Sequence, residues 1–178
     1  MTSRDDLIGS IVSTIADYRE GDIPARSGSD VDQWVRQFSD QAQDGILAEM
    51  SHVLQTTYLS RKRVIGFLRG VMKTANLVGD DPASFWKDAN LLDIQGGGAS
   101  QREMLALFRT MLQSDLGIEN SGSADNPVYV YLDDGIFTGN RALNDIRQWI
   151  NGAAPPNARL HVIASAVHRG GEYYARPC

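Results

Sequence analysis

The sequence has almost no cysteine and no long apolar run. Its one cysteine, Cys178, is the last of 178 residues. No disulfide can therefore form within the chain, which is typical of a reducing cytoplasm. No apolar stretch approaches the length needed to cross a bilayer, and the first residues are acidic rather than resembling a signal-peptide core. We therefore expect a cytoplasmic protein that makes no membrane contact.

Positive charge and histidine are also scarce. Seventeen Lys and Arg residues against 22 Asp and Glu residues give a net charge of −5, so a nucleic-acid partner is disfavoured but stays open. The three histidines are scattered and no Cys-x-x-Cys pattern occurs, so no residue is assigned as a metal ligand. A Gly-x-Ser-x-Gly nucleophile elbow is also missing, which argues against an α/β-hydrolase.

The first 80 residues carry helical patterns only. Apolar residues recur at helical spacing over residues 5–18, 30–38, 41–58 and 60–77. Ser29 or Asp30 could cap the second of these helices. We expect a helical N-terminal region, about residues 1–80, which contributes stability and can contact a protein partner.

The periodicity changes after residue 88. Strand-like runs cover residues 90–95, 127–132 and 159–167, and helical patterns cover residues 100–116 and 140–150. Ser100 and Glu103 have the spacing of a capping box at the start of the first of these helices. This alternation predicts an α/β fold with a Rossmann-like parallel sheet over residues 88–178. Three strands are few, and the chain stops eleven residues after the third, so we expect a core that is truncated at its C-terminus.

The most informative segment joins the second of these strands to the helix that begins near Asn140. Two carboxylates, Asp133 and Asp134, follow the strand, and a short loop containing Gly139 leads into the helix. The N–H groups and partial positive charge of a helix N-terminus suit a phosphate. Adjacent carboxylates suit ribose hydroxyls or a hydrated Mg²⁺. The alternative is an ordinary turn in which one Asp caps the helix.

This segment resembles the phosphoribosyl-diphosphate loop of type I phosphoribosyltransferases. That loop has an apolar strand, two acids, three variable residues, Thr-Gly, one variable residue, and then Thr or Ser. The matching positions are Val128–Leu132, Asp133, Asp134, Thr138 and Gly139. Arg141 departs from the pattern, because it replaces the small hydroxyl residue. With its long helical N-terminal region, the chain resembles divergent phosphoribosyltransferase-like proteins of bacterial conflict (anti-phage) systems.

The resemblance implies transfer of a phosphoribosyl group from phosphoribosyl diphosphate, or binding of a nucleotide, with Mg²⁺ held mainly through the ligand. The acids would hold the ribose hydroxyls, and the following loop would hold the 5′-phosphate. The implied binding residues are Asp133, Asp134, Gly135, Ile136, Phe137, Thr138, Gly139, Asn140 and Arg141. No catalytic residue can be assigned, the acceptor is not readable, and whether the protein is an active enzyme stays open.

A second glycine-rich segment lies between the first strand and its helix. In phosphoribosyltransferases a loop at such a position grips pyrophosphate, and by position this segment would do so. Its donors would be Gly97, Gly98, Ser100, Gln101 and Arg102. It lacks the Lys-Ser/Thr ending of a Walker loop. The alternative is a flexible connection in which Ser100 only caps the helix.

Two other functions stay open. A phosphoribosyl-binding fold that has lost part of its site could sense a nucleotide without catalysis, and Arg141 favours this function. Alternatively, the N-terminal half could be a helical adaptor that binds a protein or DNA. The basic residues Arg61, Lys62 and Arg63 could contact phosphates, although charges on a helix more often form a solvated face.

Overall fold

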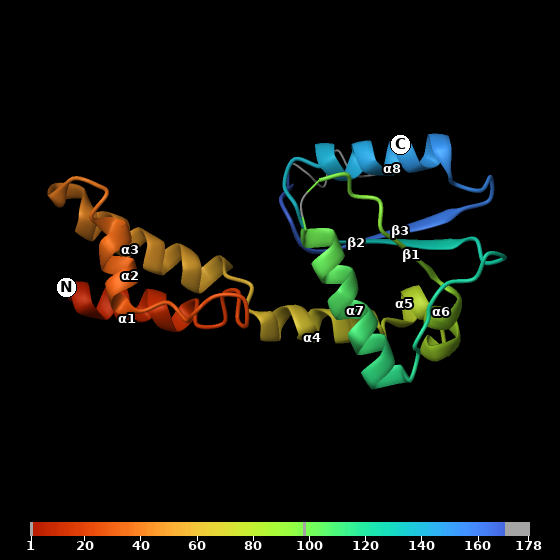
Figure 1. Cartoon of the computed structure of the whole chain (residues 1–178), viewed down its shortest axis with the longest axis horizontal. Coiled ribbons are helices and arrows are strands. Elements are labelled where there is room, and N and C mark those ends of the chain that lie inside the picture. Colours follow the sequence, from red (N-terminus) through yellow and green to blue (C-terminus); the bar gives the residue numbers. More distant parts are fainter. Residues whose placement is uncertain (1, 98, 170–178) are drawn as a thin grey trace. The chain divides into compact units, whose positions relative to one another are not determined.

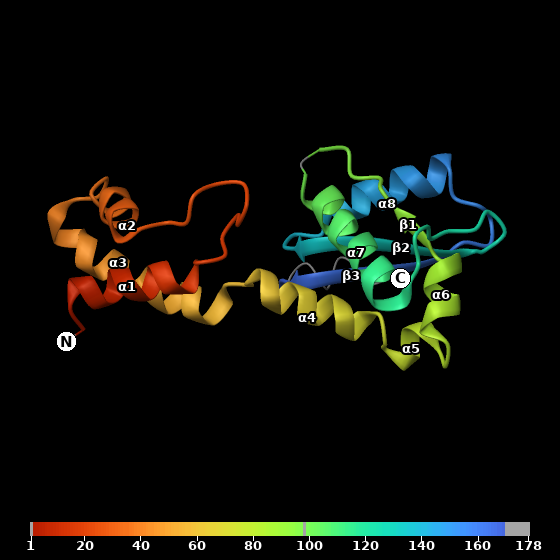
Figure 2. The same cartoon turned by 60° about the horizontal axis from the view of Figure 1, so that its bottom comes forward.

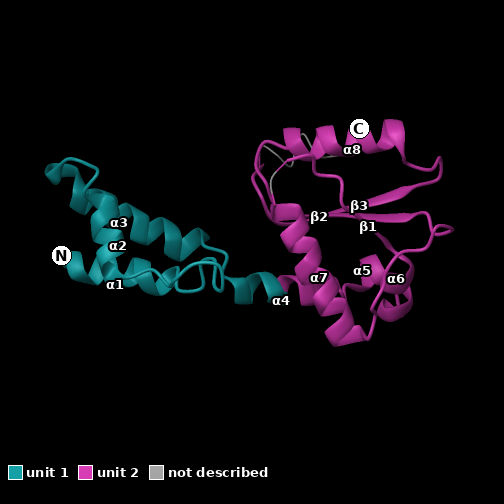
Figure 3. Cartoon of the chain, in the orientation of Figure 1, with its two compact units in different colours: residues 1–66 teal, residues 67–178 magenta. Residues whose placement is uncertain are grey.

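The computed structural model describes residues 2–97 and 99–169. The chain divides into two compact units, residues 1–66 and 67–178 (Figure 3). The helical segment around residue 80 belongs to the second unit. In the described part of the chain, no helix combines the length and the apolar character that a bilayer crossing requires.

The first unit is helical. Its helices are α1 (Arg4–Thr14), α2 (Gly28–Val35) and α3 (Asp40–Thr57), followed by the start of α4 (Arg61–Val71). Ser3 and Ser27 begin α1 and α2, each in a capping box with the Asp three residues later. The prediction that Ser29 or Asp30 caps α2 is therefore wrong, because Asp30 is the returning partner of Ser27. Helix α1 also ends earlier than predicted, at Thr14.

Asp17 ties the loop after α1 to the end of α3. The hydroxyl of Tyr58 donates to Oδ1 of Asp17 at 2.8 Å, and the backbone N–H of Arg61 donates to its Oδ2 at 2.6 Å. One carboxylate therefore holds both the C-cap residue of α3 and the first residue of α4. Charge-assisted hydrogen bonds of this kind are stronger than neutral ones.

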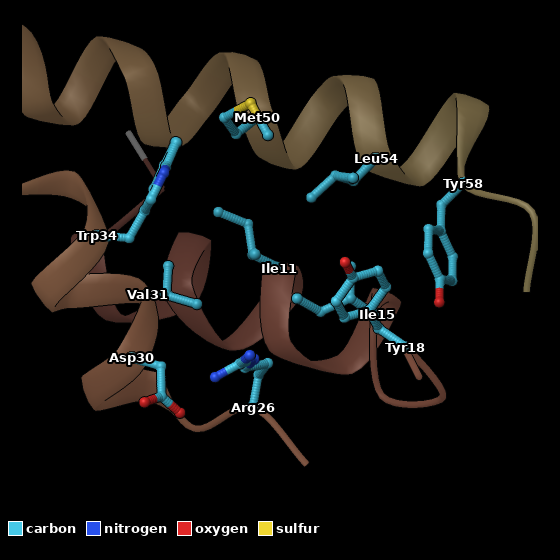
Figure 4. Close-up of a pocket in the computed structure, with 10 residues that line it drawn as sticks. All are labelled: Ile11, Ile15, Tyr18, Arg26, Asp30, Val31, Trp34, Met50, Leu54 and Tyr58. Carbon is cyan, nitrogen blue, oxygen red and sulfur yellow. The ribbon is translucent and has the colours of Figure 1, made fainter. Parts of the chain in front are cut away.

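A hollow of about 660 Å³ lies between α1, α2 and α3 (Figure 4). Aliphatic and aromatic side chains make up most of its wall. Two charged side chains, those of Arg26 and Asp30, also line it. The lining residues are Ile11, Ile15, Tyr18, Arg26, Asp30, Val31, Trp34, Met50, Leu54 and Tyr58. All of them belong to the first unit.

The predicted helix over residues 60–77 is split in two. Helix α4 ends at Val71, and the short α5 (Ala75–Val78) begins after Thr74. The carbonyl of Met72 accepts a hydrogen bond from the indole N–H of Trp86 at 3.1 Å. Trp86 is fully buried on α6 (Pro82–Asp88), so the break in the helix supplies the acceptor that a buried indole needs.

The second unit is an α/β structure, as predicted. Its strands β1 (Asn90–Leu92), β2 (Val128–Ile136) and β3 (Arg159–Val167) form a parallel sheet in the order β1-β2-β3. Helices α7 (Ser100–Leu116) and α8 (Asn140–Gly152) lie on opposite faces of this sheet (Figures 1 and 2). Because side chains alternate along a strand, Tyr129 and Tyr131 face α8, where Tyr129 packs on Trp149.

Two strand ends differ from the prediction. Strand β2 continues through the acids to Ile136, because its ladder with β3 extends from Val128 to that residue. Strand β1 stops at Leu92 instead of residue 95. The amides of Ile94 and Gln95 donate to the side chain of Gln101 rather than to a neighbouring strand.

The predicted capping box of α7 is also wrong. Ser100 is the first helical residue, and Ala99 is the N-cap, with no side-chain cap. The hydroxyl of Ser100 lies 3.4 Å from Oε1 of Gln95 instead. Strand β3 has the predicted bounds. The truncation expected at the C-terminus stays a prediction, because residues 170–178 lie outside the described part.

Candidate functional site

A pocket of about 320 Å³ lies where β2 ends and α8 begins. The structure brings most of the predicted phosphoribosyl-binding residues together around it. The lining residues are Gln95, Ser100, Asp133, Asp134, Gly135, Ile136, Phe137, Thr138, Gly139, Arg141 and Ala142. Asn140 does not line the pocket by its side chain, although its backbone N–H lies at the start of α8. The pocket is therefore at the carboxyl edge of the sheet, the usual place for ligands in open α/β folds.

The two adjacent acids have different surroundings. Asp133 is 4% exposed, whereas Asp134 is exposed to solvent. Oδ2 of Asp133 accepts a hydrogen bond from the Tyr131 hydroxyl at 3.3 Å, and its Oδ1 accepts one from the backbone N–H of Asp134 at 2.9 Å. Successive side chains on a strand point to opposite faces, so only Asp134 offers a freely accessible carboxylate.

Burial changes the acid–base properties of this strand. It raises the pKa of the Asp133 carboxyl above its ordinary value, and the negative charge of Asp134 acts in the same direction. The hydrogen bond from the Asp134 amide opposes this shift only in part. Burial also raises the pKa of the Tyr131 hydroxyl, with a further contribution from the charge of Asp133. Tyr131 therefore stays protonated and acts as a hydrogen-bond donor.

The loop before α8 depends on one glycine. Gly139 has a φ of +78°, in the left-handed region, and is the N-cap of α8 without a side-chain cap. The N–H of Asn140 lies 3.4 Å from the hydroxyl oxygen of Thr138. That hydroxyl keeps its own proton for a ligand. The uncapped first turn of α8 thus presents backbone donors and its positive dipole end to the loop.

The two predicted loops meet at Arg141. A Cβ atom added at Gly97 would lie 3.6 Å from Nη2 of Arg141, so the guanidinium passes beside the glycine-rich segment. Arg141 belongs to the first turn of α8 and also lines the pocket. One cation is therefore shared by the two segments that the sequence separates by about forty residues.

The predicted pyrophosphate-binding residues are only partly at the pocket. Ser100 lines it, but Gln101 and Arg102 do not, and Gly98 lies outside the described residues. Gln101 is 1% exposed, and its Oε1 accepts hydrogen bonds from the amides of Ile94 (3.1 Å) and Gln95 (2.9 Å). Its carbonyl therefore shapes the turn after β1 instead of facing a ligand.

Sequence reasoning missed three residues of the site. Gln95 lies at the carboxyl end of the predicted first strand, so the usual position of ligands at that edge could have indicated it. Tyr131 precedes Asp133 by two residues and shares its face, which the strand period could have shown. Ala142 could not have been found from the sequence, because its methyl group has no functional chemistry. It lines the pocket and packs in the core beneath α8.

Two basic residues of α4 form contacts within the chain. Nη1 of Arg63 donates to the carbonyl of Tyr58 at 3.2 Å. Arg69 forms an ion pair with Asp115 of α7 at 2.8 Å. Throughout residues 2–97 and 99–169, no group of three or more His, Cys, Asp or Glu side chains is arranged to hold a metal ion.

Comparison with known proteins identifies the family. A family model described as PRTase-CE matches residues 31–177, which include the pocket and both predicted loops. No curated protein and no solved structure matches the chain. The resemblance to a phosphoribosyltransferase-like family is thereby confirmed, and the match covers most of the chain. The chain belongs to the PRTase-CE family, a phosphoribosyltransferase-like family.

Proposed function

We propose that the pocket between β2 and α8 binds phosphoribosyl diphosphate or a nucleotide. One observation carries this proposal: the exposed Asp134 carboxylate, the Thr138 hydroxyl and the uncapped start of α8 adjoin a single pocket of about 320 Å³. A carboxylate accepts hydrogen bonds from ribose hydroxyls, while helix N–H groups bind phosphate. Their position around one pocket supports a ligand that carries both a ribose and a phosphate.

Each part of the ligand has a corresponding part of the pocket. Asp134 would hold the ribose 2′- and 3′-hydroxyls. The first amides of α8 and the Thr138 hydroxyl would hold the 5′-phosphate. Arg141, which lies beside Gly97, would hold a phosphate on the side of the glycine-rich segment, because a guanidinium binds phosphate oxygens in a bidentate manner.

In a transferase, the bond between the ribose C1 and the pyrophosphate oxygen breaks while C1 bonds to the acceptor. C1 becomes positively charged as pyrophosphate leaves, so the protein has to position the reactants and stabilise the leaving charge. Mg²⁺ typically needs one or two carboxylates in addition to substrate phosphates and water, and Asp134 fits that role. When bound, Mg²⁺ would neutralise charge on the departing pyrophosphate.

A second candidate function is nucleotide sensing without catalysis. It is favoured by the enclosed state of Asp133, which accepts hydrogen bonds from Tyr131 and from the Asp134 amide and so leaves one acid for the ligand. The replacement of a small hydroxyl residue by Arg141 also favours nucleotide sensing over catalysis. Binding would then switch a protein partner, which the apolar hollow of the first unit could receive. A role in bacterial defence would rest on the resemblance to conflict-system proteins.

The test uses the full chain. Phosphoribosyl diphosphate with Mg²⁺ should raise its melting temperature, and Mg²⁺ alone should not. Release of pyrophosphate in the presence of candidate bases then separates an enzyme from a sensor. If neither phosphoribosyl diphosphate, ribose 5-phosphate nor any nucleoside monophosphate changes the melting temperature or gives heat in calorimetry, the proposed binding function is wrong.

A further inference from the structure

Phe137 is the most exposed large hydrophobic side chain in the described part of the chain. Its side chain is 72% accessible to solvent, although it lies at the wall of the same pocket as Asp134 and Thr138. Leaving an aromatic ring in water forgoes the free energy that its burial would contribute. An exposed ring beside a polar pocket is therefore a candidate contact for a ligand.

The ring of Phe137 packs against the backbone of β2 at Gly135. A Cβ atom added at Gly135 would lie 3.2 Å from Cε2 and 3.6 Å from Cζ of Phe137. The carbonyl oxygen of Ala166 on β3 lies 3.9 Å from the same point. Because Gly135 has no side chain, the ring can lie against the backbone of β2. One side of the ring is thus supported by the sheet, and the rest stays open to solvent.

The neighbours of Phe137 point elsewhere. Ile136 is buried in the core beneath α8, and Thr138 directs its hydroxyl toward the amide of Asn140. Phe137 is consequently the only aromatic side chain among the described residues that line this pocket. It contributes a flat apolar surface with no hydrogen-bonding group, between the exposed acid and the phosphate-sized loop.

We propose that the open side of Phe137 is a stacking platform for a planar heteroaromatic ring attached to the ribose of the ligand. This inference rests on the proposed function, and it assigns the selectivity for a flat ring to the side chain of Phe137. An aromatic face attracts another ring by offset stacking, and all nucleobases offer such a face. The platform therefore selects for a flat ring while tolerating different bases.

The experiment compares two ligands on the full chain by titration calorimetry. Ribose 5-phosphate lacks the ring, and adenosine 5′-monophosphate carries it. In Phe137→Leu, which keeps an apolar side chain, nucleotide affinity should fall by about 5- to 150-fold, as for loss of one base–aromatic stack. Affinity for ribose 5-phosphate should fall much less, because this ligand has no ring to stack. Phe137→Tyr should restore nucleotide binding, and Ile150→Ala, at another exposed apolar position, should change neither ligand.

A second variant tests the packing of the Phe137 ring against Gly135. The methyl group of Gly135→Ala would displace the ring of Phe137, so this variant should weaken nucleotide binding more than ribose 5-phosphate binding. The effect should shrink in the double variant with Phe137→Leu, because coupled positions are not additive.

The outcomes separate the two proposals. If the parent binds neither ligand, the proposed function itself is wrong. If the parent binds ribose 5-phosphate but gains nothing from the base, the stacking platform is overturned while the phosphoribosyl site stands. The same conclusion follows if Phe137→Leu weakens both ligands equally, or neither, and the ring would then serve a different contact.

Discussion

The hydroxyl of Tyr131 donates a hydrogen bond to Oδ2 of Asp133 across 3.3 Å, with both side chains buried on the α8 face of β2. The next residue, Asp134, is on the other face and exposed. Two consecutive carboxylates thus have separate roles. Asp133 is nearly buried at the wall of the pocket, and Asp134 is the acid whose carboxylate is exposed to a ligand.

Asp133→Asn should raise stability at neutral pH. Burial raises the pKa of Asp133 in the folded protein, so folding takes up a proton between the unfolded pKa, about 4, and the folded one. The stability of the parent therefore falls as pH rises through that window. The side-chain amide introduced by the substitution carries no charge. Its oxygen can still accept the hydrogen bond from the backbone N–H of Asp134. The melting temperature of the variant minus that of the parent should increase between pH 4 and pH 8.

The control for this prediction is Asp80→Asn, at an exposed acid of the same unit. The difference in melting temperature between Asp80→Asn and the parent should not increase between pH 4 and pH 8. A constant difference for Asp133→Asn would mean that folding leaves the pKa of this carboxyl unchanged, and a decreasing one would mean that the carboxylate is stabilised in the folded state. Either result would contradict the expected effect of its burial.

Asp134→Asn should weaken binding of ribose 5-phosphate without lowering stability. Loss of a hydrogen bond to a charged group corresponds to roughly 1.5–3 kcal/mol, or about 10- to 150-fold in affinity. Calorimetric titration of parent and variant measures this. Unchanged affinity would show that the ribose hydroxyls are not held by this acid. Asp80→Asn again serves as the matched substitution.

Gln101→Ala should destabilise the second unit by about 2 kcal/mol, because two backbone amides lose their acceptor. Gln113→Ala changes an exposed glutamine of the same helix and should stay within about 0.5 kcal/mol of the parent. Urea unfolding compares the two. Equal stabilities would mean that the turn after β1 does not depend on the buried amide side chain.

Gly139→Ala should lower the free energy of unfolding by about 1 kcal/mol, because an alanine at a φ of +78° is strained. Gly152→Ala, at the end of the same helix, where a Cβ meets open space, is the comparison. Denaturant titration should separate the two variants. If Gly139→Ala is as stable as the parent, the loop can reach α8 by another conformation.

Crystals grown with sulfate should contain an anion within hydrogen-bond distance of the Gly139 and Asn140 amides. The helix dipole and the uncapped first turn act on any such anion. An empty loop, with the Asp134 carboxylate folded over the start of α8, would argue that this segment only caps a helix.

The fold class could be predicted because it depends on local periodicity. The apolar run of residues 159–167 and the helical pattern of α7 specify their elements in short windows, and the structure confirms both. The end of β2 could not be predicted in this way. Acids and a glycine are poor strand formers, and they are held in β2 by pairing with β3, which lies far along the chain.

The position of the candidate site could also be predicted from local sequence, but its detailed geometry could not. A motif of adjacent residues located the pocket, because Asp133 to Arg141 are consecutive in sequence. The different burial of the two acids and the position of Arg141 beside the glycine-rich segment arise from packing between elements. Gln101 was assigned to a ligand because of its position in the loop, whereas the structure uses its carbonyl for backbone amides.

The distribution of tryptophan gives each unit its own optical reporter. Trp34 lies exposed at the hollow of the first unit, whereas Trp86 and Trp149 are buried in the second. Aqueous quenchers should therefore reach Trp34 first, and the emission maximum of the two buried indoles should shift to longer wavelength only when the sheet unfolds. Fluorescence of Trp34→Phe, set against that of the parent, would report whether the helical unit and the α/β unit unfold together or one after the other.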